Sequence, residues 1–417
     1  MLIYLIATAL SCWLAWKGER ADRKWPWRIA AAIPLTLVAA LRWDVGTDIY
    51  HTYLPSFYAM ECERLGGGAE VVERIMGPLF DRLSGGSVDT IPKLYANYLR
   101  VFYNQEWGFR QLMTFMSWSG LGFRGLIVLT SILTGALVFT AIYRQSRSPV
   151  LAIYLYVMTS GYFLGMNIIR QYVAIGFALV AVEFIVRRKL LPFLACIGAG
   201  MLFHYSVVLL VPCYLICRIP IRPQWGIVLI AASFAFSLVA RPVVIGMLTQ
   251  AGLTHYCNYF KSPTRGFEWM FFSLNLAGLA FGSLYWRRAN DGERDGYFNA
   301  WYNMLLLGTM VLALSGAIPQ LKRINHYFAA VQFLLLPQIL TFETRRSWRR
   351  MLTGVVAVSF ALETWVAVWL ANKNEPLPYS VCPTSGHQSL RPNRYAARSW
   401  WVVFEQSENS PCEQRAE

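Results

Sequence analysis

Four short polar motifs interrupt the apolar stretches of this chain, and each contains groups that can hold an anion or move a proton. Arg binds phosphate oxygens through two parallel hydrogen bonds, whereas carboxylates and His accept protons from hydroxyl groups. Together these motifs predict a polar chamber for an anionic, lipid-anchored substrate. They are Arg42-Trp-Asp44-Val-Gly46-Thr-Asp48, Asn167-Ile-Ile-Arg170-Gln171, His204-Tyr-Ser206 and Lys322-Arg323-Ile-Asn325-His326-Tyr327.

The candidate catalytic groups are three carboxylates and one imidazole. Asp44 and Asp48 flank Gly46, which permits a tight turn that would return both carboxylates to the membrane surface. Glu106 is a further carboxylate near an apolar stretch, and His204 lies at the end of one. Any of the four could act as a general base. Each group also has a purely structural alternative. Arg42 and a neighbouring Asp would form an ion pair that only ends a helix, and His204 would be a hydrogen-bonded structural group. Glu106 would lie in the first turn of a helix, where the helix dipole favours a negative charge.

The candidate substrate-binding groups are cations, amides and aromatic rings. Residues three and four apart share one face of a helix, so a helix would present Asn167, Arg170 and Gln171 together. The alternative is that Arg170 extends to water while Asn167 caps the following helix. The complete set is Arg42, Tyr50, Tyr53, Asn167, Arg170, Gln171, Arg323, His326 and Tyr327.

The composition indicates a membrane protein. Of 417 residues, 56% are hydrophobic and only 15% are charged. Apolar runs of about 18 residues recur, each long enough to cross a bilayer of roughly 30 Å. The net charge of +15 does not indicate a nucleic-acid partner, because the basic residues follow alternate apolar runs, which is the positive-inside pattern. Representative positions are Lys17, Arg28, Arg144, Arg187, Arg218, Arg287 and Arg345.

These patterns predict an all-α, polytopic transmembrane bundle of about 12 spans with both termini external. The transmembrane domain covers 1–371, with an external loop over 44–122 that includes an interfacial helix at 112–121, and a second external loop over 242–268. An external polar tail follows at 372–417. The expected spans are 1–16, 28–42, 123–143, 149–165, 171–186, 190–204, 206–217, 225–241, 269–286, 297–316, 324–342 and 350–371. The pair 190–204 and 206–217 is also compatible with a re-entrant hairpin.

The motifs resemble those of EpsG-type exopolysaccharide polymerases, a Wzy-like group. The resemblance extends over about residues 1–345, and its five motifs occur in the order of that family. No His, Cys, Asp or Glu cluster has the spacing of a metal site, so we expect no metal or other cofactor. The matching residues are Arg42, Gly46 and Asp48; Glu106 to Phe109; Asn167, Arg170 and Gln171; Phe203, His204 and Ser206; and Arg323, Tyr327 and Phe328.

The resemblance implies a multi-pass glycosyltransferase of the inner membrane, akin to O-antigen polymerases, whose site faces the periplasm or exterior. Its substrate would be oligosaccharide repeat units on undecaprenyl pyrophosphate, with Arg residues holding the pyrophosphate and a carboxylate or His as base. Its partners would be the lipid bilayer, a flippase and a chain-length regulator.

Two other functions stay open on sequence grounds. One is another membrane glycosyl- or acyltransferase, such as an O-antigen ligase or an acyltransferase that uses His204. A ligase moves a finished glycan to a different acceptor, and an acyltransferase modifies a glycan without lengthening it, so product analysis separates them. The other is a polysaccharide transporter or flippase without chemistry.

Overall fold

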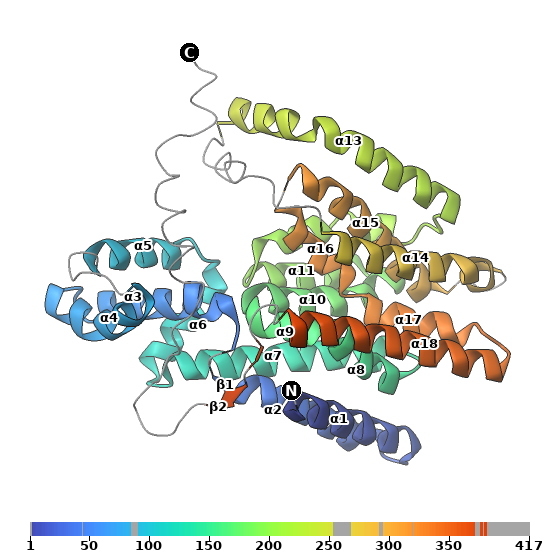
Figure 1. Cartoon of the computed structure of the whole chain (residues 1–417), viewed down its shortest axis with the longest axis horizontal. Coiled ribbons are helices and arrows are strands. Elements are labelled where there is room, and N and C mark those ends of the chain that lie inside the picture. The colour runs from blue at the N-terminus through green and yellow to red at the C-terminus, as the bar shows by residue number, and fades with distance from the viewer. Residues whose placement is uncertain are drawn as a thin grey trace. The chain divides into compact units, whose positions relative to one another are not determined.

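The computed structural model describes residues 2–43, 45–84, 91–252, 268–291, 295–318, 320–371, 376–377 and 379–381 (Figure 1). These residues are predominantly helical, which confirms the predicted class. One small antiparallel sheet pairs β1 (Arg42–Trp43) with β2 (Ser380–Val381). The chain forms two compact units. Within the described residues, the first lies in 2–181, 194–208 and 351–381, and the second in 182–193 and 209–350.

Apolar helices form most of the first unit. Helix α2 packs against both α1 and α7, and α1 also contacts α8. The contact between α2 and α7 is close because Gly135 of α7 has no side chain, so the Thr36 hydroxyl can approach its backbone. The apolar helices that lie wholly within this unit are α1 (Leu2–Arg20), α2 (Lys24–Leu41), α7 (Gly122–Gln145), α8 (Pro149–Met158), α9 (Gly161–Asn167) and η6 (Trp365–Leu370). Four further helices have residues in both units, namely α10 (Ile169–Val186), α11 (Leu190–Met201), η3 (Tyr205–Leu210) and α18 (Arg346–Thr364).

The segment expected as an external loop over 44–122 is mostly helical. Helices α3, α4, α5 and α6 gather together at the left of Figure 1. Phe109, Met113 and Met116 follow helical spacing on α6 and are buried with Phe57 and Phe123, so the apolar face of α6 packs into the protein. The expected helix at 112–121 therefore begins earlier than predicted. The elements are η1 (Ile49–Tyr53), α3 (Leu54–Arg64), α4 (Ala69–Ser84), α5 (Ile91–Tyr103) and α6 (Trp107–Trp118).

Helix α15 is the centre of the second unit. It packs against α13, α14, α16 and α17, and most of its residues are buried. Its close packing against α16 requires Gly308, where a Cβ would lie 2.5 Å from the Phe328 Cβ. The elements are α12 (Cys213–Ile216), α13 (Pro223–Gln250), α14 (Trp269–Asn290), α15 (Gly296–Ala313), η5 (Leu314–Gly316), α16 (Leu321–Ala329) and α17 (Gln332–Thr341).

Within the described residues, five helices are long and apolar enough to cross a membrane, and α8 with α9 gives a sixth if this pair, bent by 55°, is one span. The count of about 12 is therefore not confirmed, and the external position of the termini stays a prediction. The expected span 206–217 is divided between η3 and α12, and 324–342 between α16 and α17. Helix α11 has 12 residues, about 18 Å at 1.5 Å per residue, which is shorter than the bilayer core.

The close approach at Gly135 predicts a stability effect. Replacement of Gly135 by Ala should lower the free energy of unfolding by about 1–3 kcal/mol, because the new Cβ collides with Thr36. Gly198→Ala is the matched control, since Gly198 is also helical but has no heavy atom within 4 Å of the added Cβ. Denaturant unfolding of the purified variants in detergent measures the difference. Equal unfolding midpoints for the two variants would contradict the α2–α7 contact.

Candidate functional site

A buried carboxylate, Glu106, joins three segments of the first unit. Its Oε2 accepts a hydrogen bond from Arg170 Nη1 at 2.5 Å, and its Oε1 lies 2.7 Å from His204 Nδ1. The Tyr205 backbone N–H also points to Oε1, at 3.4 Å. Only 4% of Glu106 is exposed. A buried charge is costly unless it is paired, so Arg170 and His204 make this position possible for a carboxylate.

The surroundings of Glu106 keep it ionised. Burial on its own raises the pKa of the Glu106 carboxyl, but the hydrogen bond with His204 and the positive charge of Arg170 lower that pKa below its ordinary value of 4.5. An ionised carboxylate can only accept hydrogen bonds, so His204 Nδ1 carries the proton between them. In the neutral imidazole, Nε2 is then the nitrogen with a free lone pair.

Gly108 brings Glu106 within reach of His204. A Cβ at Gly108 would lie 2.6 Å from the Leu202 Cβ and 2.7 Å from the Leu202 carbonyl oxygen, so this contact requires glycine. The Phe109 N–H donates to the same carbonyl at 3.0 Å. The first turn of α6 is thus held directly against the segment that precedes His204.

A break between two helices positions Arg170. Helix α9 ends at Asn167 and α10 begins at Ile169, which places Arg170 in the first turn of α10. Asn167 and Arg170 therefore lie on two successive helices and not on one. The Arg170 guanidinium lies 5.4 Å from the ring centroid of Tyr53 and 5.7 Å from that of Phe109. Such cation–π contacts add to the ion pair in fixing the side chain.

Asn167 holds the turn that precedes η1. Its Oδ1 accepts hydrogen bonds from the Asp48 N–H at 2.9 Å and from the Thr47 hydroxyl at 3.3 Å. Gly46 has a φ of +102°, and a Cβ there would lie 3.1 Å from the Met166 carbonyl oxygen. Gly46 thus has the left-handed backbone that the expected turn requires, and Asn167 connects this segment to the break before Arg170.

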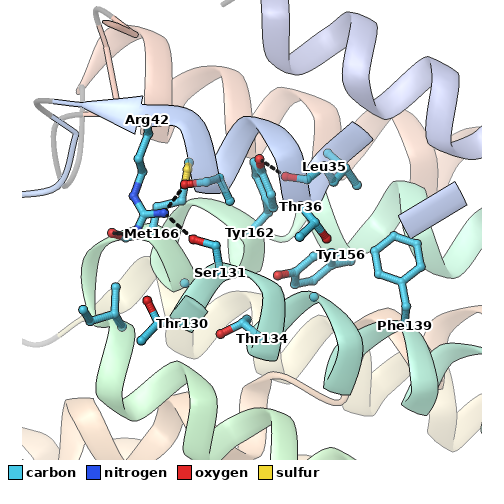
Figure 2. Close-up of a pocket in the computed structure, with 14 residues that line it drawn as sticks. Leu35, Thr36, Arg42, Thr130, Ser131, Thr134, Phe139, Tyr156, Tyr162 and Met166 are labelled. Carbon is cyan, nitrogen blue, oxygen red and sulfur yellow. Dashed lines mark hydrogen bonds between the residues drawn. The ribbon is translucent and has the colours of Figure 1, made fainter. Parts of the chain in front are cut away.

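Arg42 points into the protein. It is 3% exposed and donates hydrogen bonds to the Ala39 carbonyl, to Ser131 Oγ at 2.8 Å and to the Met166 carbonyl at 3.2 Å. Figure 2 shows the guanidinium between Ser131 and Met166, beside a cavity of about 20 Å³ that Tyr156 also lines. This volume is large enough for about one water molecule. Arg42 therefore connects α2, α7 and α9.

The other predicted residues of the first unit lie in different settings. Asp48 is half-buried at the N-terminus of η1, Tyr53 is buried in the aromatic core, and Gln171 is buried in the first turn of α10. Asp44 lies outside the described residues. Tyr50 belongs to η1, but its side chain also lies outside the described part.

The last predicted motif belongs to α16 of the second unit. Arg323 is exposed, Tyr327 is buried, and the His326 ring packs edge-on against Phe271 at 5.9 Å. Lys322 forms an ion pair with Glu268 at 3.2 Å. That these residues share a chamber with Arg170 stays a prediction.

The contacts of Glu106 with Arg170 and His204 and the role of Gly108 were not predicted from the sequence. The sequence signal for this close contact was Gly108, which lies two residues after Glu106 at the start of the amphipathic helix α6. Among the residues that the structure describes, no three His, Cys, Asp or Glu side chains come together as metal ligands would.

Comparison with known proteins gives one result. No curated protein and no solved structure matches the chain. The model of the EpsG family matches residues 25–381, a range that contains Glu106, Arg170, His204 and all the other predicted site residues. This chain belongs to the EpsG family.

Proposed function

We propose that this protein is a polymerase that joins undecaprenyl-pyrophosphate-linked oligosaccharide repeat units on the outer face of the inner membrane. Membership of the EpsG family and the apolar helices support a membrane polysaccharide polymerase in general. The observation that carries the finer proposal is the series of contacts from Arg170 through Glu106 to His204, at 2.5 and 2.7 Å. It combines a cation, a buried carboxylate and an oriented imidazole.

The proposed reaction is a glycosyl transfer. The oxygen of an acceptor hydroxyl forms a bond to the anomeric carbon of the donor sugar, while the bond from that carbon to the pyrophosphate oxygen breaks. Undecaprenyl pyrophosphate leaves with the electron pair, and the hydroxyl proton passes to His204 Nε2. Glu106 holds the imidazole in the required tautomer and stabilises its protonated form, as the acid of a Ser-His-Asp triad does. The His204 side chain is 24% exposed, so a substrate can reach it.

The arginines take different parts in this proposal. A leaving pyrophosphate requires fixed positive charge where its own charge develops. The Arg170 side chain is 18% exposed and lies next to the proposed base, so we assign this role to Arg170. Arg42 donates to three protein oxygens and is assigned to positioning the Met166–Asn167 segment. Arg323 remains a second candidate for pyrophosphate binding on sequence grounds.

The first test concerns the base. His204→Ala should lower the elongation rate by about 10²–10⁴-fold, the usual contribution of a general base. Asp48→Asn is the matched comparison, because Asp48 is a described candidate base with no other assigned role and its backbone position is fixed by Asn167. The measurement is elongation of lipid-linked repeat units by purified variants at matched concentration. A large loss with Asp48→Asn and near-normal polymer with His204→Ala would identify Asp48 as the base.

The second test separates the chemical role of Glu106 from its structural one. Glu106→Gln leaves the Arg170 charge without its anion, so it should lower the free energy of unfolding by about 3–5 kcal/mol. Adding Arg170→Gln should recover part of that stability, because the unpaired charge is then removed. Elongation should remain at least about 10²-fold slower in both proteins. Recovery of elongation together with stability would show that the pair is only structural.

The third test concerns orientation. We expect the segment between α6 and α7 to lie outside the cytoplasm and the start of α18 to lie inside, since basic residues cluster at 345–350. Ser119 and Ser347 are exposed at these two places. In a variant without other cysteines, Ser119→Cys should react with a membrane-impermeant maleimide on intact cells, whereas Ser347→Cys should react only after lysis. The opposite labelling pattern would invert the proposed orientation.

A further inference from the structure

An open groove of about 420 Å³ lies where α3, α5 and α6 meet. Its volume is within the range of small-ligand sites, roughly 300–1,000 Å³. The groove is not lined by Arg170, Glu106 or His204, the groups assigned to the reaction. It is lined by Trp107, which directly follows Glu106 in the chain.

Helix α6 presents two different faces. Phe109 and Met113, four residues apart, are buried in the core of the first unit. Trp107, Arg110 and Gln111 are three and four residues apart on another face and line the groove. The Trp107 side chain is thus available to a ligand, and the residue is 56% exposed.

The groove offers the groups that a sugar ring requires. Sugars have apolar C–H faces, which stack on aromatic rings, and hydroxyls, which bind carboxylates, amides and guanidinium groups. Tyr103 is 49% exposed, and its hydroxyl donates to Glu63 Oε2 at 2.7 Å, which fixes the ring. Arg110 and Gln111 supply hydrogen-bond donors from α6.

We propose that this groove binds the glycan part of the substrate, as a subsite that continues from the reacting sugar. The proposal rests on the proposed function, and the order Glu106–Trp107 supports it, because a glycan stacked on Trp107 lies one residue from the carboxylate that orients His204. A membrane-anchoring role for Trp107 is the competing explanation. Glu63, Arg64 and Arg110 line the same groove and offer acceptors and donors for sugar hydroxyls, which a purely anchoring face does not require, and this favours the glycan.

The test is binding of a lipid-free oligosaccharide of two repeat units, released from the polysaccharide of the producing cell. The full chain in lipid nanodiscs is titrated and followed by saturation-transfer NMR. Trp107→Ala should raise the Kd by about tenfold, and Gln111→Ala, an exposed position that leaves the core intact, by about threefold. Trp118→Ala is the matched control, because Trp118 ends the same helix, is 80% exposed and lies outside the groove, so the Kd should stay unchanged.

The outcomes separate this proposal from the proposed function. The groove proposal would be overturned if the wild-type chain did not bind the oligosaccharide, or if the Kd were unchanged in both Trp107→Ala and Gln111→Ala. Either result would count against the groove even if the protein elongates lipid-linked glycans. If the Kd values change as expected but the protein does not elongate lipid-linked glycans, the groove proposal is supported and the polymerase proposal is overturned. Equal losses in Trp107→Ala and Trp118→Ala would show a general membrane effect and would also overturn the groove.

Discussion

The burial of one carboxylate, Glu106, constrains the first unit more than any other interaction described. A charge that is 4% exposed requires partners, and here they come from segments 64 and 98 residues further along the chain. Each segment has a local irregularity that makes the contact possible. Gly108 lets α6 approach Leu202, and the break at Ile168 turns the first residues of α10 toward Glu106.

Three arginines of similar sequence context have three different environments. Arg42 is enclosed and donates to backbone carbonyls and a hydroxyl, Arg170 is paired with a carboxylate beside two aromatic rings, and Arg323 is exposed on α16. A positive charge next to an apolar helix therefore does not by itself indicate anion binding. The number of its donors already used by the protein is a better guide, because a satisfied guanidinium has little left for a substrate.

The fold class and many residues of the candidate site could be predicted from the sequence, because polar groups beside apolar helices must find partners. Glu106, Arg170 and His204 were all among the predicted residues, and the turn at Gly46 followed from glycine itself. The pairings did not follow, since they depend on contacts distant in sequence. The break at Ile168 has no proline or glycine within two residues of it, and the inward course of Arg42 depends on a carbonyl 124 residues away.

The short sheet has a consequence for how the protein is made. Strand β1 includes Arg42, and its partner β2 lies at 380–381; beside it, Tyr379 donates to the Val38 carbonyl and Tyr4 to the Pro376 carbonyl, each at 2.9 Å. A ribosome produces the amino-terminal helices first, so α1 and α2 are made long before these partners exist. The region that leads into the Gly46 turn therefore gains these contacts only after residues 376–381 have been made, and a nascent chain that lacks them cannot carry a finished site.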